Sequence, residues 1–479
     1  MEFKCNKNIF KDKTKRISIE KIELFSEFVV FHYSLNKDFD FQTRIYYPTN
    51  VISNLISIYK EDELTFLFSN MAFFETFKFM MIFPDELDIT KVENFIHPES
   101  IKFFEENVQN LYSQHVYENK RFDWKGPKII FNNLKDNSPL SIKYDEIKVN
   151  KNDRPLLVSN GGGKDSFLMM KLLIDGNINF SIFTHARSEY GRYDIQFKYQ
   201  DKLQKFVTDK YVKNECHNHK IIVHDDFTDG VFATFNYKDL KGECIDGKTC
   251  QVGLFPEMII NSLPFVLLHG YSYFVLGNER SANANQVNNV KELETVNHQY
   301  LKCFKGENSL NNLLKYLIKD FGVFSILRPV YDLRIYQNIS KYPEILPYVH
   351  SCNVHKPWCS DCPKCAYVYC HFCSIYDYEL VLAQFKENLF DKENLEVYWK
   401  QLLGLSDQNA FECVGEINEC RIAMNQCLKK GLKGKAIEIF KENGLDKINY
   451  EEIQKKYINP IFEEILIPED ILNKIKEYY

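Results

Sequence analysis

The chain has 479 residues, a formal net charge of −6 and 14 cysteines. Its length predicts two or three domains, and its negative charge argues against a general nucleic-acid-binding protein, although not against a local basic cleft. The longest apolar stretch, residues 264–277, is interrupted by His269 and Gly270 and is too short for a membrane span. The charged N-terminus has no signal-peptide core, so the cysteines indicate thiols and metal ligands in a cytoplasmic protein.

The N-terminal part, residues 1–150, is predicted to form a separate α+β module. Two runs of β-branched and aromatic residues, at residues 22–34 and 40–48, are typical of two strands in a meander. Helical patterns follow over residues 52–83 and 97–112. This part shows no constellation of catalytic side chains.

After a polar link over residues 132–153, strands alternate with helices in a second predicted domain, residues 151–345. Short apolar strands separated by helical stretches, such as residues 257–269, predict a parallel sheet that is covered on both faces. The candidate strands are residues 156–159, 180–184, 220–224, 273–276 and 324–327. Ligands bind at the carboxyl ends of such strands, where the loops at residues 161–163, 186–187 and 278–281 would meet.

The first of these strands runs into a glycine-rich turn, Gly161-Gly162-Gly163, which opens a helix. Glycines let an anion approach the backbone, and a helix N-terminus offers free N–H groups, so this turn predicts a phosphate site. Asp165 and Ser166 lie in the first helical turn, where a carboxylate and a hydroxyl can help to hold a metal–phosphate group. A glycine-rich turn that binds no ligand is the alternative.

The spacing of this turn excludes two common nucleotide motifs. A Walker A loop needs Ser or Thr after its lysine, but Asp165 follows Lys164, and the dinucleotide fingerprint Gly-x-Gly-x-x-Gly is absent. Residues 161–166 instead resemble the pyrophosphate loop of the ATP pyrophosphatases, Ser-Gly-Gly-x-Asp-Ser. Those enzymes cleave ATP to AMP and pyrophosphate. Gly161 stands at the position of the first serine, so one hydroxyl contact to phosphate is absent.

Two polar segments follow the fourth candidate strand, at residues 277–285 and 296–300. Glu279 is a candidate for holding a metal or a substrate amine, and Arg280 for gripping a carboxylate or phosphate. His298 can act as an acid or base near neutral pH. Helix capping and a structural histidine are the alternatives for each residue alone, but their clustering at the end of a predicted strand favours a functional site.

The last predicted region, residues 346–479, is cysteine-rich and then helical. Four cysteines lie within fourteen residues: Cys352, Cys359, Cys362 and Cys365. Thiols at this spacing can bind zinc, and a closed four-sulfur site is structural because no position is left for water. Zinc is favoured over an iron–sulfur cluster because the ferredoxin spacings do not match. Cys370 and Cys373 could replace one ligand, and four free buried thiols are the remaining alternative.

Several motifs together resemble those of the UDP-N-acetylmuramoyl-L-alanyl-L-glutamate epimerases, over nearly the whole chain. They are the glycine-rich loop, Asn278-Glu-Arg-Ser281, Val296-Asn-His-Gln-Tyr300, Leu327-Arg-Pro329, Ser351-Cys-Asn353, the Trp358–Cys365 segment and Phe411-Glu-Cys-Val-Gly415. The Asn-Glu-Arg-Ser and Asn-His-Gln-Tyr pair is the most specific. The 7-cyano-7-deazaguanine synthases share the loop and the cysteine cluster, but usually have a shorter chain without this N-terminal module.

The resemblance implies an α/β fold of the PP-loop (HUP-like) type, a doubly wound parallel sheet with an N-terminal α+β module and a zinc-binding helical C-terminal region. It also implies an ATP- and magnesium-dependent epimerase of peptidoglycan synthesis. The terminal L-Glu of a UDP-linked muramoyl dipeptide becomes D-Glu through an acyl-adenylate, and AMP and pyrophosphate are released. Adenylation removes the carboxylate charge, so that a base can take the α-proton and an acid can return one.

The resemblance also suggests roles for individual residues. Pyrophosphate would be bound by Gly161, Gly162, Gly163 and Lys164, and magnesium and phosphate by Asp165 and Ser166. Arg280 would bind a carboxylate or phosphate, and Glu279 and His298 would act as acid and base. Structural zinc would be held by Cys352, Cys359, Cys362 and Cys365. No nucleic acid or membrane partner is expected. Two other classes stay open: an ammonia-requiring ligase of the 7-cyano-7-deazaguanine synthase type, and a non-catalytic adenine-nucleotide sensor.

Overall fold

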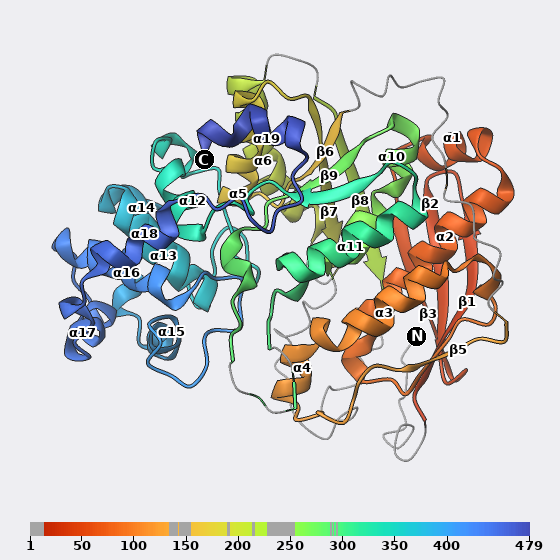
Figure 1. The fold of residues 1–479 in the computed structure, drawn as a ribbon, viewed down its shortest axis with the longest axis horizontal. Coiled ribbons are helices and arrows are strands. Elements are labelled where there is room, and N and C mark those ends of the chain that lie inside the picture. Colours follow the sequence, from red (N-terminus) through yellow and green to blue (C-terminus); the bar gives the residue numbers. More distant parts are fainter. Residues whose placement is uncertain are drawn as a thin grey trace.

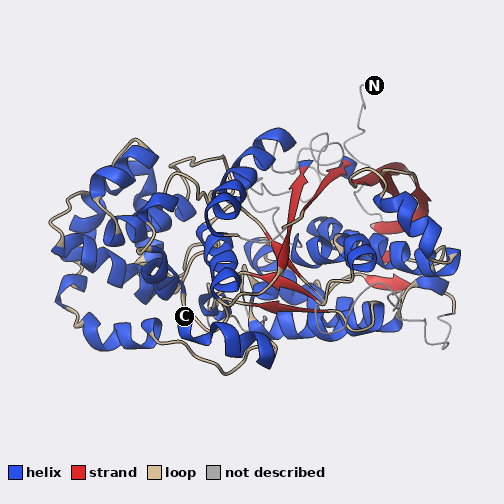
Figure 2. Cartoon of the chain, turned by 90° about the horizontal axis from the view of Figure 1, so that it is seen from above, coloured by secondary structure: helices blue, strands red, loops and turns tan. Residues whose placement is uncertain are grey.

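The computed structural model describes residues 14–133, 142, 155–188, 192–212, 216–227, 254–287, 290, 292–293 and 296–479. The N-terminal strands lie at one end of the long axis, the C-terminal helices at the other, and the central strands between them (Figure 1). Figure 2 shows the same order from above. Within the described residues, no helix combines the length and the apolarity that crossing a membrane requires.

One mixed sheet of ten strands organises the described part of the chain, in the order β10-β9-β6-β7-β8-β3-β2-β1-β4-β5. The strands are β1 Arg16–Leu24, β2 Phe28–Leu35, β3 Phe39–Tyr46, β4 Glu86–Asp88, β5 Lys128–Ile130, β6 Leu156–Ser159, β7 Phe180–Arg187, β8 Asn218–Asp225, β9 Tyr273–Leu276 and β10 Gly322–Ser325. The protein is therefore of the α/β class.

The five strands from β10 to β8 are parallel, as the sequence predicts. β6 and β9 coincide with their predicted strands, the predictions for β7 and β8 fall inside longer strands, and β10 begins two residues earlier than predicted. The chain winds from β6 outward to β7 and β8, then returns to β9 beside β6 and continues to β10. The winding direction thus reverses between β6 and β9, which is where open α/β sheets bind ligands.

The N-terminal strands extend this sheet, because β3 pairs antiparallel with β8 in a register that sets Thr43 opposite Asp225. The predicted strand over residues 40–48 is confirmed as β3. The prediction of one strand over residues 22–34 is wrong: β1 ends at Leu24 and β2 begins at Phe28, with a tight turn closed by the Phe25 N–H donating to the Phe28 carbonyl at 2.9 Å. This turn holds no glycine or proline, so the sequence carries no turn signal there.

Helices cover both faces of the sheet. The described α-helices are α1 Val51–Ile58, α2 Glu61–Glu75, α3 Pro98–Leu111, α4 Ser113–Glu118, α5 Lys164–Asp175, α6 Tyr193–Tyr211, α9 Leu254–Asn261, α10 Leu263–His269, α11 Phe304–Leu317, α12 Asp332–Ile339, α13 Pro363–Ile375, α14 Tyr378–Phe385, α15 Glu396–Leu402, α16 Ile417–Lys429, α17 Lys435–Glu442, α18 Tyr450–Ile458 and α19 Glu469–Ile475. The predicted helical stretch over residues 257–269 is divided between α9 and α10 at Ser262.

Alternate residues of the central strands enter two different hydrophobic cores. Leu157 on β6 packs in a core with the N-terminal helices and α9 to α11. Its neighbours Leu156 and Val158 pack on the other face with α5, α12 and the C-terminal helices. Such alternation confirms the predicted covering of both faces, since successive strand residues point to opposite sides.

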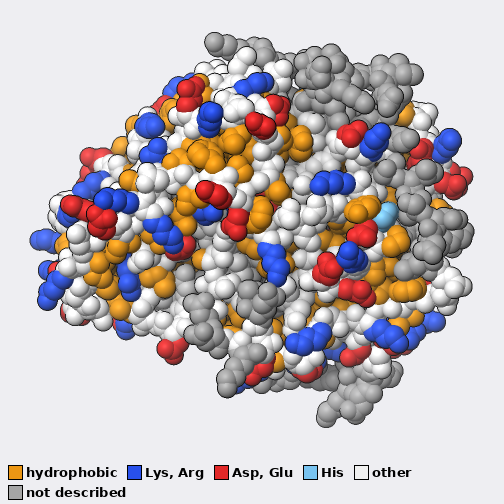
Figure 3. All heavy atoms as spheres, viewed as in Figure 1, with side chains coloured by type: hydrophobic (Ala, Val, Ile, Leu, Met, Phe, Trp, Pro, Cys, Tyr) orange, Lys and Arg blue, Asp and Glu red, His pale blue; other side chains and the backbone are white. Residues whose placement is uncertain are grey.

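The division into three domains at residues 150 and 345 stays a prediction, and most of the predicted link over residues 132–153 lies outside the described residues. What the structure adds is that the N-terminal and central parts share one sheet and one core. On the face drawn in Figure 3, acidic and basic side chains are interspersed among apolar ones, in keeping with the small net charge of −6.

Candidate functional site

A cavity of about 370 Å³ lies at the carboxyl ends of β6 and β9, where the winding of the sheet reverses. Its lining includes Gly161, Gly163, Asp165, Ser166, Gly277, Asn278, Glu279, His298, Lys302, Ser351, Cys352, Asn353, Lys364 and Cys413. The predicted loops after β6 and β9 therefore meet, as the strand pattern indicates. The loop after β7 contributes less, because His185, two residues before the end of β7, is the β7 residue that lines the cavity.

The glycine-rich turn leads into α5 without a side-chain cap. Gly162 has φ +79°, a left-handed conformation that glycine adopts without strain, and its N–H donates to Asn160 Oδ1 at 3.0 Å. Gly163 is the N-cap residue of α5, and its carbonyl accepts the first helical hydrogen bond, from the Phe167 N–H. The first N–H groups of α5 thus have no intrahelical acceptor, and this end of the helix can bind an anion.

Asp165 and Ser166 face the cavity, but Lys164 does not. The Lys164 side chain is 2% exposed, and its Nζ lies 2.5 Å from Asp332 Oδ1 and 2.6 Å from Asp165 Oδ1. Burial lowers the pKa of Lys164, but the carboxylates of Asp165 and Asp332 outweigh it and hold the pKa well above its usual range. Lys164 therefore fixes Asp165 from beneath the loop.

Glu279 follows β9 and lines the cavity near this carboxylate group. Burial raises its pKa, and the negative charges of Asp332 and Asp165 raise it further, against the opposing effect of Lys164. A carboxyl in this environment holds its proton more tightly than usual and can donate it.

Arg280 lies away from the cavity lining. Its guanidinium donates to the main-chain carbonyls of Ile461, at 3.0 Å, and Glu463. In this arrangement Arg280 anchors the segment before α19 to the loop after β9. Its predicted contact with a substrate anion stays a prediction.

His298 is held in one orientation by the N-terminal part of the chain. Its Nδ1 lies 2.5 Å from Gln114 Oε1, while Gln114 Nε2 donates to Glu118 Oε1 at 3.1 Å and so fixes the amide. Because an amide oxygen only accepts, Nδ1 carries the proton in this hydrogen bond. A ring nitrogen of His298 also lies within 4.8 Å of the Cys413 sulfur. Burial lowers the pKa of His298, but the Cys413 and Glu412 charges outweigh it, so the pKa is raised overall.

Cys413 and Lys302 are functional candidates that were not predicted from the sequence. Lys302 Nζ lies 2.9 Å from Cys413 Sγ, and both side chains line the cavity. Burial raises the pKa of Cys413, but Lys302 and His298 outweigh it and lower the pKa to about 7. The contact joins residues 111 positions apart, so no local pattern reveals it, although Cys413 stands in the Phe411–Gly415 motif.

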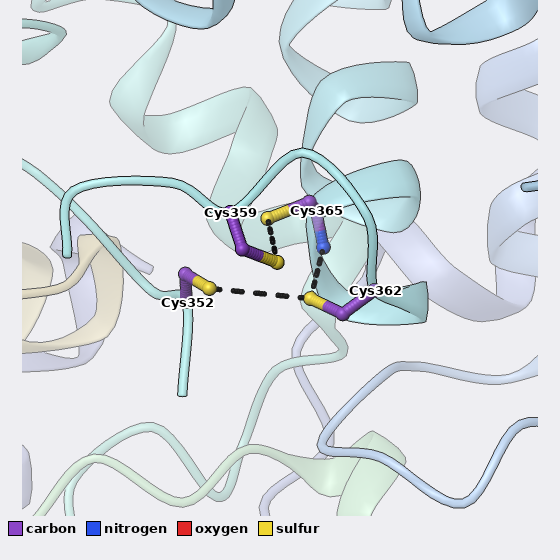
Figure 4. A group of neighbouring side chains, drawn as sticks. All are labelled: Cys352, Cys359, Cys362 and Cys365. Atoms are coloured by element: carbon purple, nitrogen blue, oxygen red, sulfur yellow. Dashed lines mark hydrogen bonds between the residues drawn. The ribbon is translucent and has the colours of Figure 1, made fainter. Parts of the chain in front are cut away.

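The four predicted cysteine ligands converge beside the cavity, which Cys352 also lines (Figure 4). Their Sγ atoms all lie within 4.8 Å of one another, with Cys352 4.0 Å from Cys362 and Cys359 3.8 Å from Cys365. Four sulfurs bound to one zinc ion at about 2.3 Å would be about 3.8 Å apart, so the group fits a single tetrahedral ion. The cluster could therefore hold a metal such as zinc.

Main-chain N–H groups also point at these sulfurs. Asp361 N–H donates to Cys359 Sγ, and Cys365 N–H donates to Cys362 Sγ, each at 3.4 Å. Such donors stabilise thiolates and are common around metal-bound cysteines. Cys370 and Cys373 lie further along α13, outside the group of four.

Two family models match parts of the chain: the MurL C-terminal domain over residues 348–445 and the MurL N-terminal domain over residues 253–326. Three curated relatives are named UDP-N-acetyl-alpha-D-muramoyl-L-alanyl-L-glutamate epimerase. The protein of Xanthomonas oryzae pv. oryzae is 31% identical over 187 residues, which is 36% of this chain and 41% of the relative. The proteins of Micromonospora sp. and Salinispora tropica are 32% and 31% identical over 188 residues, 36% of this chain and 41% and 40% of their own lengths.

The matched region thus spans less than half the length of these curated relatives. Both domain models cover residues that build the cavity: the first includes Cys352, Lys364 and Cys413, and the second includes Glu279 and His298. No solved structure matches the sequence significantly.

Proposed function

We propose that this protein is an ATP-dependent epimerase that converts the terminal L-Glu of UDP-N-acetylmuramoyl-L-alanyl-L-glutamate to D-Glu through an acyl-adenylate, with release of AMP and pyrophosphate. One observation carries the proposal: an uncapped helix N-terminus and a cluster of acid–base side chains line the same cavity. The names of the curated relatives support the epimerisation. The cytoplasmic synthesis of peptidoglycan precursors would be its setting.

The phosphates of ATP would bind at the N-terminus of α5. The glycine turn lets them approach the backbone, and the free N–H groups and the helix dipole favour negative charge there. Lys302 and Lys364 also line the cavity and add positive charge. The fold would then be the nucleotide-binding PP-loop type, with its ligand at the switch point between β6 and β9.

Magnesium would be held by oxygen donors beside this helix end. Asp165 and Ser166 line the cavity, and Glu279 lies close enough for its charge to act on that of Asp165. Carboxylate and hydroxyl oxygens are suited to Mg²⁺, which would supply charge neutralisation of the phosphates. Zinc at the four cysteines would be structural, because all four of its positions would be filled.

Epimerisation would use acid–base side chains of the same cavity. A free carboxylate suppresses loss of its own α-proton, because a second negative charge would develop beside the first. Adenylation removes that charge, and a base and an acid can then exchange the proton. His298 and Glu279 are the acid–base candidates from the sequence, and both line the cavity.

The direct test is incubation with ATP, magnesium and UDP-N-acetylmuramoyl-L-alanyl-L-glutamate, followed by hydrolysis and chiral separation of the glutamate. We expect D-Glu only when ATP is present, together with AMP and pyrophosphate. AMP and pyrophosphate without D-Glu would refute epimerisation, and an amide formed only with ammonia would indicate the ligase class. ATP binding without any product would indicate a nucleotide sensor.

Two variants in α5 test whether this activity takes place in the cavity. Asp165→Asn should abolish pyrophosphate release, because Asp165 faces the cavity. Asp175→Asn is the matched control, since Asp175 lies at the other end of the same helix and pairs with Lys171. Full activity of the Asp165 variant would place ATP elsewhere.

A further inference from the structure

We propose that Cys413, held as a thiolate by Lys302, is the group that removes the α-proton of the activated glutamyl residue. This assignment rests on the proposed epimerase function and gives the role of base to Cys413 rather than to His298, the candidate from the sequence. Its basis is a cluster of Cys413, Lys302 and His298 on the wall of the same cavity as the glycine-rich turn.

Two separate parts of the chain build this cluster. Cys413 lies in the loop before α16, Lys302 ends the short 3₁₀ helix Tyr300–Lys302, and His298 precedes that helix. The Cys413 side chain is half-buried and lines the cavity, so its sulfur is accessible from the cavity. A thiol is therefore presented to the space where a substrate bound near α5 would place its acyl group.

The charges around Cys413 favour its thiolate. Lys302 Nζ lies 2.9 Å from the sulfur, and a ring nitrogen of His298 and a carboxylate oxygen of Glu412 lie within 4.8 Å of it. Lys364 donates to the Cys413 carbonyl from α13. Burial raises the pKa of this thiol, but Lys302 and His298 outweigh it and lower the pKa to about 7, near the value suited to a base at neutral pH.

A metal site formed by His298, Glu412 and Cys413 is the competing interpretation of the same geometry. These three side chains offer donors within 4.8 Å of one another. However, the Lys302 ammonium already lies in hydrogen-bonding contact with the sulfur, where it would repel a bound cation. Burial lowers the pKa of Lys302, but Cys413 and Glu279 outweigh it and raise the pKa, so Lys302 stays charged.

The proton transfer balances without any further reactant. The thiolate sulfur takes the α-proton and becomes a thiol, while the C–H electron pair moves onto the acyl carbonyl as an enolate. An acid on the opposite face then protonates the carbon, and the electron pair returns to it. The Cys413 thiol then loses its proton to solvent and the acid takes one from solvent, so that both groups return to their starting states. Glu279 is the candidate for the acid, because it lines the cavity and burial raises its pKa.

The kinetic test separates adenylation from epimerisation. Cys413→Ala should release pyrophosphate in the presence of substrate, but should form D-Glu about 10² to 10⁴ times more slowly than the natural protein. Asp165→Asn should lose both products, and Cys216→Ala, at a half-buried thiol outside the cavity, should lose neither. D-Glu formation by Cys413→Ala at the natural rate would overturn the role of Cys413 alone. If the natural protein forms no D-Glu, the proposed function fails and this assignment with it.

The chemical test measures the thiolate itself. The rate of alkylation by iodoacetamide, mapped by mass spectrometry, should rise with pH around 7 at Cys413 and around 11 at Cys216, where burial raises the pKa to about 11. Lys302→Met should move the Cys413 midpoint to higher pH, because it removes the main cation beside the sulfur. An unmoved midpoint, or a metal ion that is lost with Cys413→Ala, would overturn the proposal.

Discussion

At the scale of single residues, Lys302 interacts with both proposed acid–base groups of the cavity. Its ammonium contacts the Cys413 sulfur, and its charge also acts on Glu279. One lysine therefore favours the deprotonated form of a base and stands near a candidate acid. Lys164, which precedes Asp165, has a different role, because its ammonium forms salt bridges with Asp165 and Asp332 beneath the loop.

Gly162 offers a test of the turn at the residue scale. Its φ of +79° is strained for alanine, so Gly162→Ala should lower the free energy of unfolding by about 1–2 kcal/mol and reduce ATP turnover on the order of 10²-fold. Gly431→Ala is the matched control, since Gly431 also has φ +79° and an added Cβ would meet nothing within 4 Å. It should show the same loss of stability, measured by urea unfolding, with unchanged turnover. Equal turnover in both variants would contradict a role for the turn.

The position of the glycine-rich turn can be predicted from the sequence because its pattern is local. A strand, a turn and a helix start follow one another over residues 156–166, and Gly161, Asp165 and Ser166 line the cavity. Phosphate binding there stays a prediction. Cys413 could not be found in this way, because its pKa depends on Lys302 and His298, which only the tertiary fold brings near. The position of Arg280 outside the cavity lining was also not predictable, since its partners lie in the segment before α19.

At the scale of elements, the loop before α13 brings the four cysteines of the cluster together. Two Cys-x-x-Cys steps turn the backbone so that N–H groups meet sulfur, and Cys352 closes the group from the preceding segment. The loop also supplies Asn353 to the cavity, and the first turn of α13 supplies Lys364. A metal here would therefore support the cavity wall as well as the C-terminal helices.

Removing one ligand should release the metal. Cys362→Ser should lower zinc content from about one ion per chain to near zero, measured by mass spectrometry of the metal, because structural zinc needs all four ligands. The melting temperature should fall on the order of 10 °C, since metal binding is linked to folding. Cys216→Ser is the control and should retain zinc. Unchanged zinc content in the Cys362 variant would rule out this ligand set.

Element prediction succeeded for the central strands and failed at one hairpin. Buried parallel strands are short, apolar and bounded by turns, so β6 and β9 could be identified residue by residue. The turn between β1 and β2 consists of Phe25, Ser26 and Glu27, and its apolar and charged residues continue the strand pattern on both sides. The hydrogen-bonded pairing of β1 with β2, rather than the β-propensity of these residues, decides where the two strands end.

At the scale of the whole molecule, the sheet joins the N-terminal part to the cavity-bearing part. Lys78 strengthens this connection from the core: its Nζ lies 2.7 Å from Glu75 Oε2 and 3.0 Å from Asp225 Oδ2 at the end of β8. Gln114 is a second contact between the two parts, because it orients His298 in the cavity wall. The N-terminal part thus shapes the site although it supplies no catalytic motif.

Lys78→Met should destabilise the whole sheet. It removes the cation that pairs with two buried carboxylates, which should cost about 3–5 kcal/mol in the free energy of unfolding. Urea unfolding followed by tryptophan fluorescence should show the loss. Lys455→Met, at an exposed pair with Glu452, is the control and should change little. Equal stability of the two variants would mean that the buried contact does not hold the parts together.

The most direct test of the account is exchange of the glutamyl α-proton with solvent. The protein is incubated in D2O with UDP-N-acetylmuramoyl-L-alanyl-L-glutamate, magnesium and either ATP or no nucleotide, and the isolated glutamate is analysed by mass spectrometry and chiral separation. If the cavity activates the carboxylate before a base takes the proton, D-Glu should carry one deuterium, and only in the sample with ATP. Absence of deuterium with ATP, or equal exchange without it, would contradict the account.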